Sequence, residues 1–288
     1  MIKRGSRVPG LRKLITPLWN TYEHIKFSYY VRRNIMFEHW NSAMDPFEIY
    51  WISPKKINIP TSSVEFDFIT DTSKTYNGDW DMNVAGIQTG IYYKSFVERF
   101  DEKKPWEQTP IYKDRADRIN RGTDTRYVSV SEYKEKLQFY DQLYHDFKSG
   151  NYYLQSELVD RKQIDLPGDG GRGLFPRFTD KSLIRHEVAV NIGRDGRFIR
   201  NDGRHRLALA FLAGLDEIPV RVVVRHTQWQ ILRDKVVQSI NKFINSGIST
   251  NSILEAVEDN LDEELKDVFM GIDHPDIQSI FDQHLPRE

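Results

Sequence analysis

The stretch NDGRHRLALAFLAGLDEIPVRVVVRH, residues 201–226, decides the fold because it joins a turn, a helix and a strand. The opening Asn-Asp-Gly is typical of a turn. Residues 203–213 predict a largely apolar helix that ends at Gly214, the residue preferred in the left-handed conformation after a helix. Pro219 introduces a strand with alternating valines, which place one apolar face on a core.

A β-hairpin is predicted directly before this stretch. Residues 186–192 alternate around two valines and an isoleucine, and residues 193–196 contain an Asp-Gly pair that favours a tight turn. Residues 197–200 then start a return strand. The whole segment predicts the order strand, turn, strand, helix, strand.

Cationic side chains occupy the start of the predicted helix, although the aligned peptide dipoles favour anions there. With Asp202 as the N-cap, Gly203, Arg204 and His205 fill the first three helical positions and Arg206 follows. Free N–H groups, a glycine and guanidinium groups together are typical of a phosphate site. We therefore expect this helix start to bind an anion.

A structural alternative applies to the same cations. They could point into solvent or pair with nearby acids such as Asp180 or Glu187, at a cost of only about 0.3–1 kcal/mol from the helix dipole. An Arg-His-Arg sequence directly after Asp-Gly, at the mouth of an apolar helix, favours anion binding over this alternative.

These residues resemble the signature of the ParB/sulfiredoxin-like superfamily. In that family a strand leads into Gly-x-[His/Arg]-Arg at a helix start, followed by an alanine-rich helix, a Gly-Leu turn and a strand beginning [Ile/Val]-Pro. The matching positions are Gly203, His205, Arg206, Leu207, Ala208, Gly214, Leu215, Ile218, Pro219, Val220 and Val222. The similarity covers residues 187–225, and WISPKKI near Trp51 is similar to the opening strand of the family. It implies an α+β fold with a small mixed sheet and packed helices.

The resemblance also implies that Gly203, Arg204, His205 and Arg206 hold the phosphates of a nucleoside triphosphate, ATP or CTP, usually with Mg²⁺. The superfamily includes CTP-dependent partition proteins, sulfiredoxins, a kinase of free serine and proteins described as nucleases. The chain has no cysteine, which excludes sulfiredoxin activity. Its helical region from Gln228 onward is acidic, unlike the DNA-binding continuation of the partition proteins.

Carboxylates are needed if Mg²⁺ binds, because Mg²⁺ favours carboxylate, phosphate and water oxygens. Asp202 is nearest to the helix start, and Asp79 and Asp81 in the sequence GDWD are further candidates. Asp169 lies in a glycine-rich segment. Phosphoryl transfer also needs a general base, for which we consider Glu187, Asp202 and the GDWD acids. The alternative is that these acids are simply solvated.

Two loops have both a structural and a functional interpretation. Trp80 in GDWD either anchors its loop on the core, which is the favoured interpretation, or stacks on a base or sugar. The segment GDGGRG, residues 168–173, is interpreted as a flexible lid or connector, because it lacks the Lys-Ser/Thr ending of a P-loop.

Three regions are expected along the chain. A basic helical segment covers residues 1–45, the ParB/sulfiredoxin-like domain covers 46–226 with an insertion at about 70–180, and an acidic helical extension covers 227–288. Further expected elements are strands at 48–52 and 64–69, helices at 90–100, 130–149 and from 227 to 247, a loop at 166–178, and a charged surface excursion at 103–127.

Composition and charge limit the classes of protein. The absence of cysteine excludes disulfides and thiolate metal sites, and no apolar run approaches the ~20 residues of a membrane span. We expect a cytoplasmic protein without membrane insertion. The net charge of −1 conceals a basic N-terminal segment and an acidic C-terminal one. Solvated helix faces or attraction between the two ends explain this asymmetry, and a nucleic-acid-binding arm is the alternative.

The expected function is nucleotide or phosphate-ester binding, with Mg²⁺-dependent phosphotransferase or nucleotidase chemistry as its enzymatic form. The alternative is a nucleic-acid-binding protein, partition-like or nuclease-like, that uses the same arginines and the basic N-terminus. The partner is then a nucleotide, a phosphorylated small molecule or a nucleic acid. The oligomeric state is left open.

Overall fold

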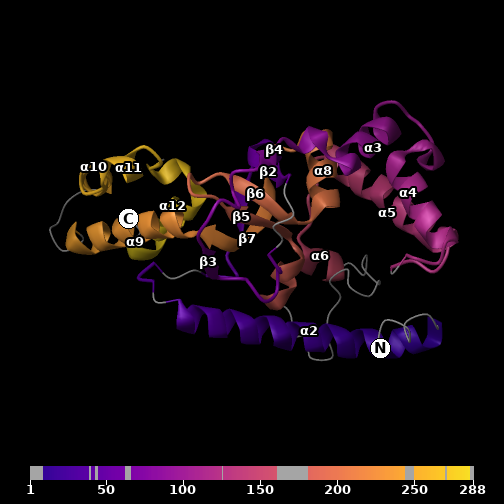
Figure 1. The fold of residues 1–288 in the computed structure, drawn as a ribbon, viewed down its shortest axis with the longest axis horizontal. Helices are drawn as coiled ribbons and strands as arrows, with labels where there is room; N and C mark the ends of the chain where they lie inside the picture. Colours follow the sequence, from indigo (N-terminus) through magenta and orange to yellow (C-terminus); the bar gives the residue numbers. More distant parts are fainter. Residues whose placement is uncertain are drawn as a thin grey trace.

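The computed structural model describes residues 9–38, 40–42, 45–61, 66–124, 126–160, 181–243, 250–269 and 271–285. A mixed sheet lies at the centre of the protein (Figure 1). In the view of Figure 1, helices α3, α4, α5 and α8 lie to its right, α9 to α12 lie to its left, and α2 runs along the lower edge. The expected mixture of helices around a mixed sheet is confirmed.

The sheet is built around strand β7, which has neighbours on both sides. The strand order is β1-β7-β5-β6-β2-β4, and β3 also pairs with β7. β7 is parallel to β5 and β3 but antiparallel to β1. The strands are β1 (Tyr50–Ile52), β2 (Ile57–Pro60), β3 (Lys74–Tyr76), β4 (Val84–Ala85), β5 (Val188–Ile192), β6 (Phe198–Asp202) and β7 (Ile218–His226).

The predicted hairpin and the strand after it are confirmed as β5, β6 and β7. β5 and β6 are antiparallel, with Ile192 opposite Phe198. The strand expected at 48–52 is present as the shorter β1. Two strands, β3 and β4, come from the region predicted as an insertion. Part of that region therefore belongs to the sheet.

The strand predicted at 64–69 is wrong over residues 66–69, and its first two residues lie outside the described part of the chain. The Asp67 carboxylate accepts hydrogen bonds from the backbone N–H groups of Ile69 and Thr70, at 2.9 and 2.7 Å. Such bonds from an Asp side chain to the N–H groups two and three residues later fix a turn. The turn chemistry of Asp67 therefore overrides the apolar alternation. The loop expected at 166–178 also lies outside the described residues.

The helices expected at 90–100 and 130–149 are confirmed as α3 and α5. The helix expected from 227 to 247 is confirmed as α9 up to Phe243, and its expected end lies outside the described residues. The helices are α2 (Pro9–Phe37), α3 (Ile91–Phe100), α4 (Pro110–Asn120), α5 (Val130–Lys148), α6 (Gln155–Asp160), α8 (Arg204–Ala213), α9 (Thr227–Phe243), α10 (Thr250–Asp259), α11 (Glu263–Lys266) and α12 (Pro275–His284). Among the described residues, none of these helices is long and hydrophobic enough to cross a membrane.

The region 103–127, expected to be a charged surface excursion, contains regular structure that was not predicted. It contains the 3₁₀ turn Trp106–Gln108 and helix α4, which begins with Pro110 directly after Thr109. Proline is favoured in the first helical turn because the N–H that it lacks would have no partner there. Trp106 and Ile111 are buried in the main core. Packing against α3 and α5 therefore orders a segment that has little apolar periodicity.

Helix α8 lies where the sheet meets α3 and α5. Its Leu207, Ala208, Leu209 and Ala210 are buried in the same core as the valines of β5 and β7. The alanines allow close approach to the neighbouring elements, and α8 makes extensive contacts with both α3 and α5. The start of α8 is thereby held against helices that come from the middle of the chain.

A buried ionic cluster joins the C-terminal helices to the sheet. Asp276 on α12 is fully buried and accepts hydrogen bonds from Arg225 on β7 and Arg233 on α9. Tyr50 on β1 and Trp229 also donate to this carboxylate, at 3.0 and 2.8 Å. The acidic C-terminal region is therefore tied to the sheet. The start of α2 and helices α10 and α11 lie at opposite ends of the molecule (Figure 1), which argues against attraction between the two ends.

Candidate functional site

The junction between β6 and α8 differs from the prediction in one respect. Asp202 was expected to cap the helix, but it is the last residue of β6, and Gly203 is the N-cap, with φ +84°. No side chain caps this helix start. A Cβ on Gly203 would lie 2.9 Å from Cα of Val188. Glycine is needed because the chain must turn sharply from strand to helix while passing the backbone of β5.

The three basic side chains at the start of α8 point to two different sides of the helix. Arg206 turns toward the protein interior, where it donates to the Glu187 carboxylate at 3.0 Å and to the carbonyl of His186. Tyr152 lies 3.4 Å from the same guanidinium. Arg206 therefore follows the structural alternative, in which an arginine of the helix start pairs with a nearby acid.

Glu187, predicted as a general base, is the buried partner of Arg206. Its carboxylate also accepts a hydrogen bond from the backbone N–H of Gln155 at 2.6 Å. Burial raises the pKa of Glu187, while Arg206 and this N–H act in the opposite direction. Its contacts are those of a structural carboxylate that faces the interior.

Arg204 and His205 turn toward helices α3 and α5. The guanidinium of Arg204 lies 4.5 Å from the ring centroid of Tyr92. The His205 ring meets Tyr92 edge-on at 4.5 Å and stacks on Tyr140 at 5.0 Å. These two residues of the predicted site therefore belong to an aromatic cluster.

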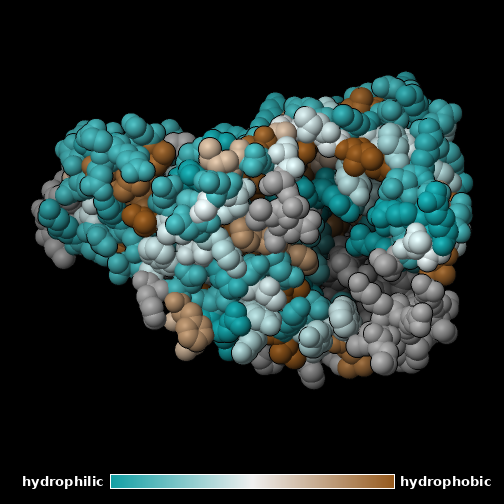
Figure 2. Space-filling view, in the orientation of Figure 1, coloured by the Kyte–Doolittle hydropathy of each residue, from teal (hydrophilic) through white to brown (hydrophobic). Residues whose placement is uncertain are grey.

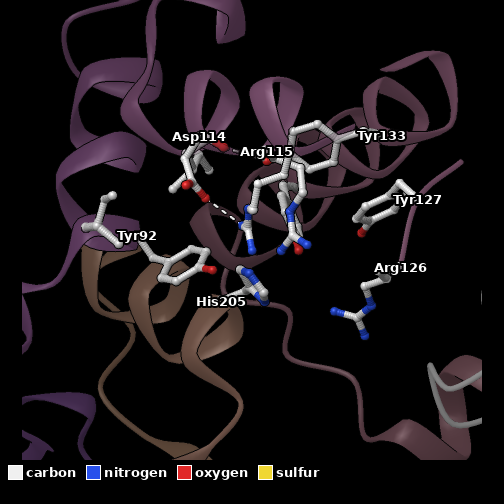
Figure 3. A pocket seen from close by; sticks show the side chains of 11 residues that line it. Tyr92, Asp114, Arg115, Arg126, Tyr127, Tyr133 and His205 are labelled. Atoms are coloured by element: carbon white, nitrogen blue, oxygen red, sulfur yellow. Dashed lines mark hydrogen bonds and ion pairs between the residues drawn. The ribbon is translucent and has the colours of Figure 1, made fainter. Parts of the chain in front are cut away.

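This cluster forms one wall of a partly open pocket with a cavity volume of about 30 Å³. Figure 3 shows Tyr92 and His205 on one side, Tyr127 and Arg126 on the other, and Arg115 between them. The lining residues come from α3, α4, the segment before α5, α5 and α8. They are Ile91, Tyr92, Ile111, Asp114, Arg115, Arg118, Arg126, Tyr127, Tyr133, Tyr140 and His205.

Cations exceed carboxylates around the cavity. Arg115 pairs with Asp124 at 2.8 Å, and Arg118 pairs with Asp114 at 2.5 Å. The Nε atom of Arg118 is buried and has no hydrogen-bond partner among the described residues. Arg126 and Arg204 are exposed. An anion that enters the cavity would meet guanidinium groups from α4 and from the segment before α5, and Arg204 lies close by, next to Tyr92.

The pKa of His205 reflects this positive potential. Burial lowers the pKa of His205 well below its usual range, and the neighbouring cations lower it further, although part of the side chain remains exposed. These cations are Arg204, Lys136, Arg126 and Arg115. Neutral His205 can donate from one ring nitrogen and accept at the other. Burial also raises the pKa of Tyr133, so its hydroxyl stays protonated near neutral pH.

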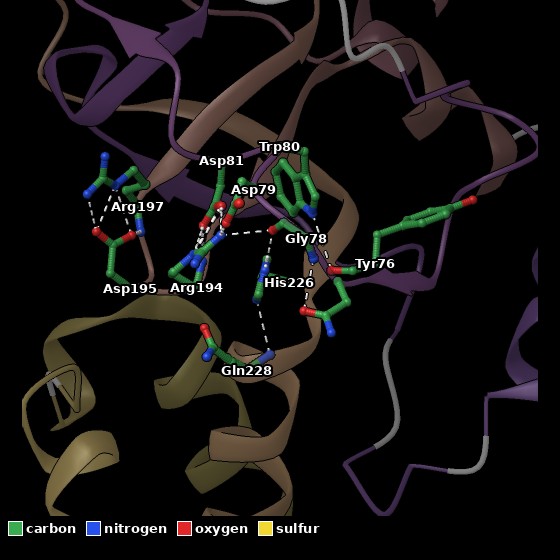
Figure 4. Close-up of polar contacts among 11 residues, drawn as sticks. Tyr76, Gly78, Asp79, Trp80, Asp81, Arg194, Asp195, Arg197, His226 and Gln228 are labelled. Atoms are coloured by element: carbon green, nitrogen blue, oxygen red, sulfur yellow. Dashed lines mark hydrogen bonds and ion pairs between the residues drawn. The ribbon is translucent and has the colours of Figure 1, made fainter.

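Asp79 and Asp81, predicted as metal ligands, are held by an arginine. The backbone N–H of Arg194 donates to Asp81 at 2.7 Å, and its guanidinium bridges Asp81 and Asp79, each at 2.8 Å (Figure 4). The same guanidinium donates to the carbonyl of Gly78, which also contacts His226. Arg194 lowers the pKa of Asp81, even though burial acts in the opposite direction. This network closes the β5–β6 turn over the end of β7.

The structure does not bring Asp202 together with Asp79 and Asp81. Arg194 precedes β6, whereas Asp202 is the last residue of that strand. The four residues from the start of β6 to Asp202 alone span ~13 Å at ~3.3 Å per residue. The described residues contain no group of three or more His, Cys, Asp or Glu side chains arranged to hold a metal ion. Among the described residues, these candidate Mg²⁺ ligands are therefore not brought together in one group.

Trp80 anchors its loop, as the favoured interpretation predicts. Its side chain is nearly buried, and its Nε1 donates to the carbonyl of Tyr76 at 3.2 Å. Phe66 packs edge-on against its ring, and His226 lies on another side of it. The glycine-rich residues 168–173 and Asp169 lie outside the described part of the chain.

Several residues that line the cavity were not predicted from the sequence to be part of the site. Arg115, Arg118 and Arg126 lie in the region expected to be a charged surface excursion. Thr109 and Pro110, at the start of α4, form a helix start signal. In that helix Ile111 and Arg115 are four residues apart, and Arg118 is three further on, which places all three on one face. The sequence alone did not show that this face meets the start of α8.

Comparisons of the chain with protein-family models, curated proteins and solved structures gave no match. The fold defines the protein as a mixed α/β protein with a mixed sheet. Its function is therefore argued from the cavity beside α8.

Proposed function

We propose that the protein binds a nucleotide or a related phosphate ester in the cavity beside the start of α8. One observation carries this proposal: Arg115, Arg126 and His205, from three parts of the chain, converge on a single cavity that tyrosines also line. Arg204 adds a further cation next to Tyr92. The site thus combines groups that bind phosphate with groups that bind a planar ring.

The phosphate would be held by guanidinium groups. Arginine offers planar pairs of N–H donors that match phosphate oxygens. The unpartnered Nε of Arg118 would gain an acceptor from a bound anion. The ion pairs of Arg115 with Asp124 and of Arg118 with Asp114 hold both side chains in place before the ligand arrives.

The tyrosines would hold the base or sugar of the ligand. Tyr92, Tyr127 and Tyr140 present aromatic surface to the cavity, and stacking of a base on an aromatic ring contributes about 1–3 kcal/mol. Their hydroxyl groups can also donate hydrogen bonds. A nucleoside phosphate uses both halves of this site, whereas inorganic phosphate uses only the cationic half.

The resemblance to the ParB/sulfiredoxin-like superfamily supports the same proposal. The β5–β6 hairpin, Gly203, helix α8 and strand β7 follow one another as in the family's signature. In this chain the third cation, Arg206, is engaged by Glu187, so we propose that Arg204 and His205 contribute to the ligand site. Phosphotransferase or nucleotidase activity remains the proposed chemistry.

The residues considered for Mg²⁺ do not form a ligand set in the described structure. Arg194 holds Asp79 and Asp81, and Asp114, the carboxylate among the described residues that line the cavity, pairs with Arg118. We therefore propose that arginines, rather than a bound Mg²⁺ ion, supply the positive charge that binds the phosphate. The experiment compares binding with and without Mg²⁺.

The test is calorimetric titration of the whole chain with inorganic phosphate, AMP, CMP, ATP and CTP, each with and without Mg²⁺. We expect at least one nucleotide to bind more tightly than inorganic phosphate. Arg126→Ala and Arg204→Ala should each weaken that binding by about tenfold, because a hydrogen bond to a charged group contributes about 1.5–3 kcal/mol. Release of phosphate or a change of the nucleotide, followed in the same samples, tests turnover.

The matched control is Arg121→Ala, which removes another exposed guanidinium at the end of α4, where it pairs with Asp117. This variant should bind like the wild type. Absence of binding by the wild type, or equal binding by Arg126→Ala and Arg204→Ala, contradicts the proposal. Binding of DNA that weakens steeply with salt would instead support the nucleic-acid alternative.

A further inference from the structure

One face of helix α2 is exposed and almost wholly apolar. Within residues 18–37, where its side chains are described, every exposed residue except Arg32 is hydrophobic. The set includes Ile25, which is 65% exposed, and Phe37, which is 73% exposed. The exposed hydrophobic residues are Leu18, Trp19, Tyr22, Ile25, Tyr29, Ile35, Met36 and Phe37.

The opposite face of α2 is fixed to the protein. Phe27 and Val31 are buried with Ile69, and the Asn34 side chain donates to the carbonyls of Thr70 and Thr72, at 3.0 and 2.8 Å. The buried positions are Asn20, His24, Phe27, Val31 and Asn34. Their spacing alternates between four and three residues, as does that of Leu18, Tyr22, Ile25 and Tyr29. The helix therefore has two separate faces, and within the described part of the chain one of them is packed and the other is exposed.

The exposed face is a continuous ridge. Residues three and four apart are neighbours on a helix surface, so Leu18, Tyr22, Ile25 and Tyr29 adjoin one another. Figure 2 shows hydrophobic side chains along the lower edge of the molecule, where Figure 1 places α2, on a surface that is otherwise mainly hydrophilic. Contiguous apolar surface of this kind marks an interaction site.

Charge and side-chain type indicate what covers this face. Residues 1–37 contain eight lysines and arginines and a single acid, Glu23. An anionic surface complements this charge, whereas a second copy of α2 would bring like charges together. A nucleic acid would require cations across the contact face, and Arg32 is the exposed cation among the described side chains of α2. The face also contains Trp19, Tyr22 and Tyr29, and Trp and Tyr side chains favour the boundary between lipid and water.

We propose that α2 docks the protein on an anionic lipid surface, with the helix axis in the plane of the membrane. The ridge from Leu18 to Phe37 inserts among the lipid headgroups, and the basic residues contact lipid phosphates. Helices with an aromatic and aliphatic face and basic neighbours bind membranes in this way. Lys26 and Arg33, which are half-buried beside the ridge, can extend their charged ends toward the headgroups.

The first test is flotation of the whole protein with vesicles of phosphatidylcholine, with or without phosphatidylglycerol. We expect binding to the anionic vesicles and weaker binding to the neutral ones. Ile25→Glu combined with Tyr29→Glu should reduce binding by more than about tenfold, because two large apolar side chains are lost from the contact. Arg32→Gln should weaken binding to anionic vesicles by about fivefold, and much less to neutral ones.

The matched control combines Met82→Glu with Ile272→Glu, which places the same charges at two exposed apolar residues away from α2. Its binding should equal that of the wild type, and circular dichroism and thermal unfolding should show that all the variants are folded. Equal vesicle binding by the wild type and the α2 double variant overturns the proposal. So does a concentration-dependent dimer that this variant dissociates while the wild type ignores vesicles, because α2 would then bind a second copy.

Discussion

His205 and Arg206 are adjacent in the sequence, but their side chains point to different parts of the protein. Successive residues of a helix point about 100° apart. His205 therefore reaches Tyr140 on α5, whereas Arg206 reaches Glu187 at the start of the hairpin. At the level of single residues, the chemistry of each side chain depends on which side of α8 it occupies.

Asp276 gives a prediction about stability at the same scale. Asp276→Asn should lower the free energy of unfolding by about 3–5 kcal/mol, because it leaves Arg225 and Arg233 buried without their negative partner. Denaturation by urea measures this change. The matched control is Asp282→Asn on the same helix, where the carboxylate is exposed and accepts a bond from Gln278. A loss below 1 kcal/mol in Asp276→Asn would show that the cluster contributes little.

The β6–α8 junction sets the position of the cavity wall at the scale of the elements. Gly203 and Gly214 both have positive φ, +84° and +80°, but only Gly203 lies against the backbone of another strand. Because α8 begins at this point, a shift of its first turn would move Arg204 and His205 relative to Tyr92 and Tyr140.

Alanine substitutions at these two glycines should therefore differ. Gly214→Ala should cost about 1–2 kcal/mol of unfolding free energy, the cost of the left-handed conformation for a residue with a Cβ. Gly203→Ala should cost more, because its Cβ would also lie 2.9 Å from Cα of Val188. Thermal or urea unfolding of both variants measures the difference. Equal losses of unfolding free energy would show that the backbone of β5 can shift away from the new Cβ at little cost.

Buried histidines make the stability of the whole molecule depend on pH. Burial lowers the pKa values of His186, His205 and His274 in the folded protein. The unfolded chain, with histidine pKa values of about 6.5, binds more protons than the folded one below that pH. The free energy of unfolding should therefore fall as the pH drops below about 6.5 toward the lower folded pKa values, by up to about 1.4 kcal/mol per pH unit for each histidine.

Removal of one histidine tests this dependence. His205→Gln should reduce the slope of unfolding free energy against pH between about 5 and 6.5 by the contribution of one proton. His145→Gln, at an exposed position on α5, is the control and should leave the slope almost unchanged. An unchanged slope in His205→Gln would mean that His205 takes up its proton in the folded protein. Burial raises the pKa of Glu187, so Glu187 changes the unfolding free energy with pH in the opposite direction. Both variants retain Glu187, so its effect cancels in the comparison.

The sequence by itself determined the central unit of the fold. The β5–β6 hairpin, the end of α8 at Gly214 and the strand β7 were predicted because alternation, helical spacing and turn residues are properties of neighbouring residues. The helix at 130–149 was predicted for the same reason. The sequence also indicated that the start of α8 is unusual, because three cations occupy its first turn.

Only the tertiary structure decided the composition of the candidate site. It placed His205 beside Arg115 and Arg126, paired Arg206 with Glu187, and assigned Asp79 and Asp81 to Arg194. It also showed that, among the described residues, one face of α2 is exposed and apolar. Contacts between residues far apart in the sequence depend on how elements pack, and the local spacing that predicts an element carries no information about its neighbours.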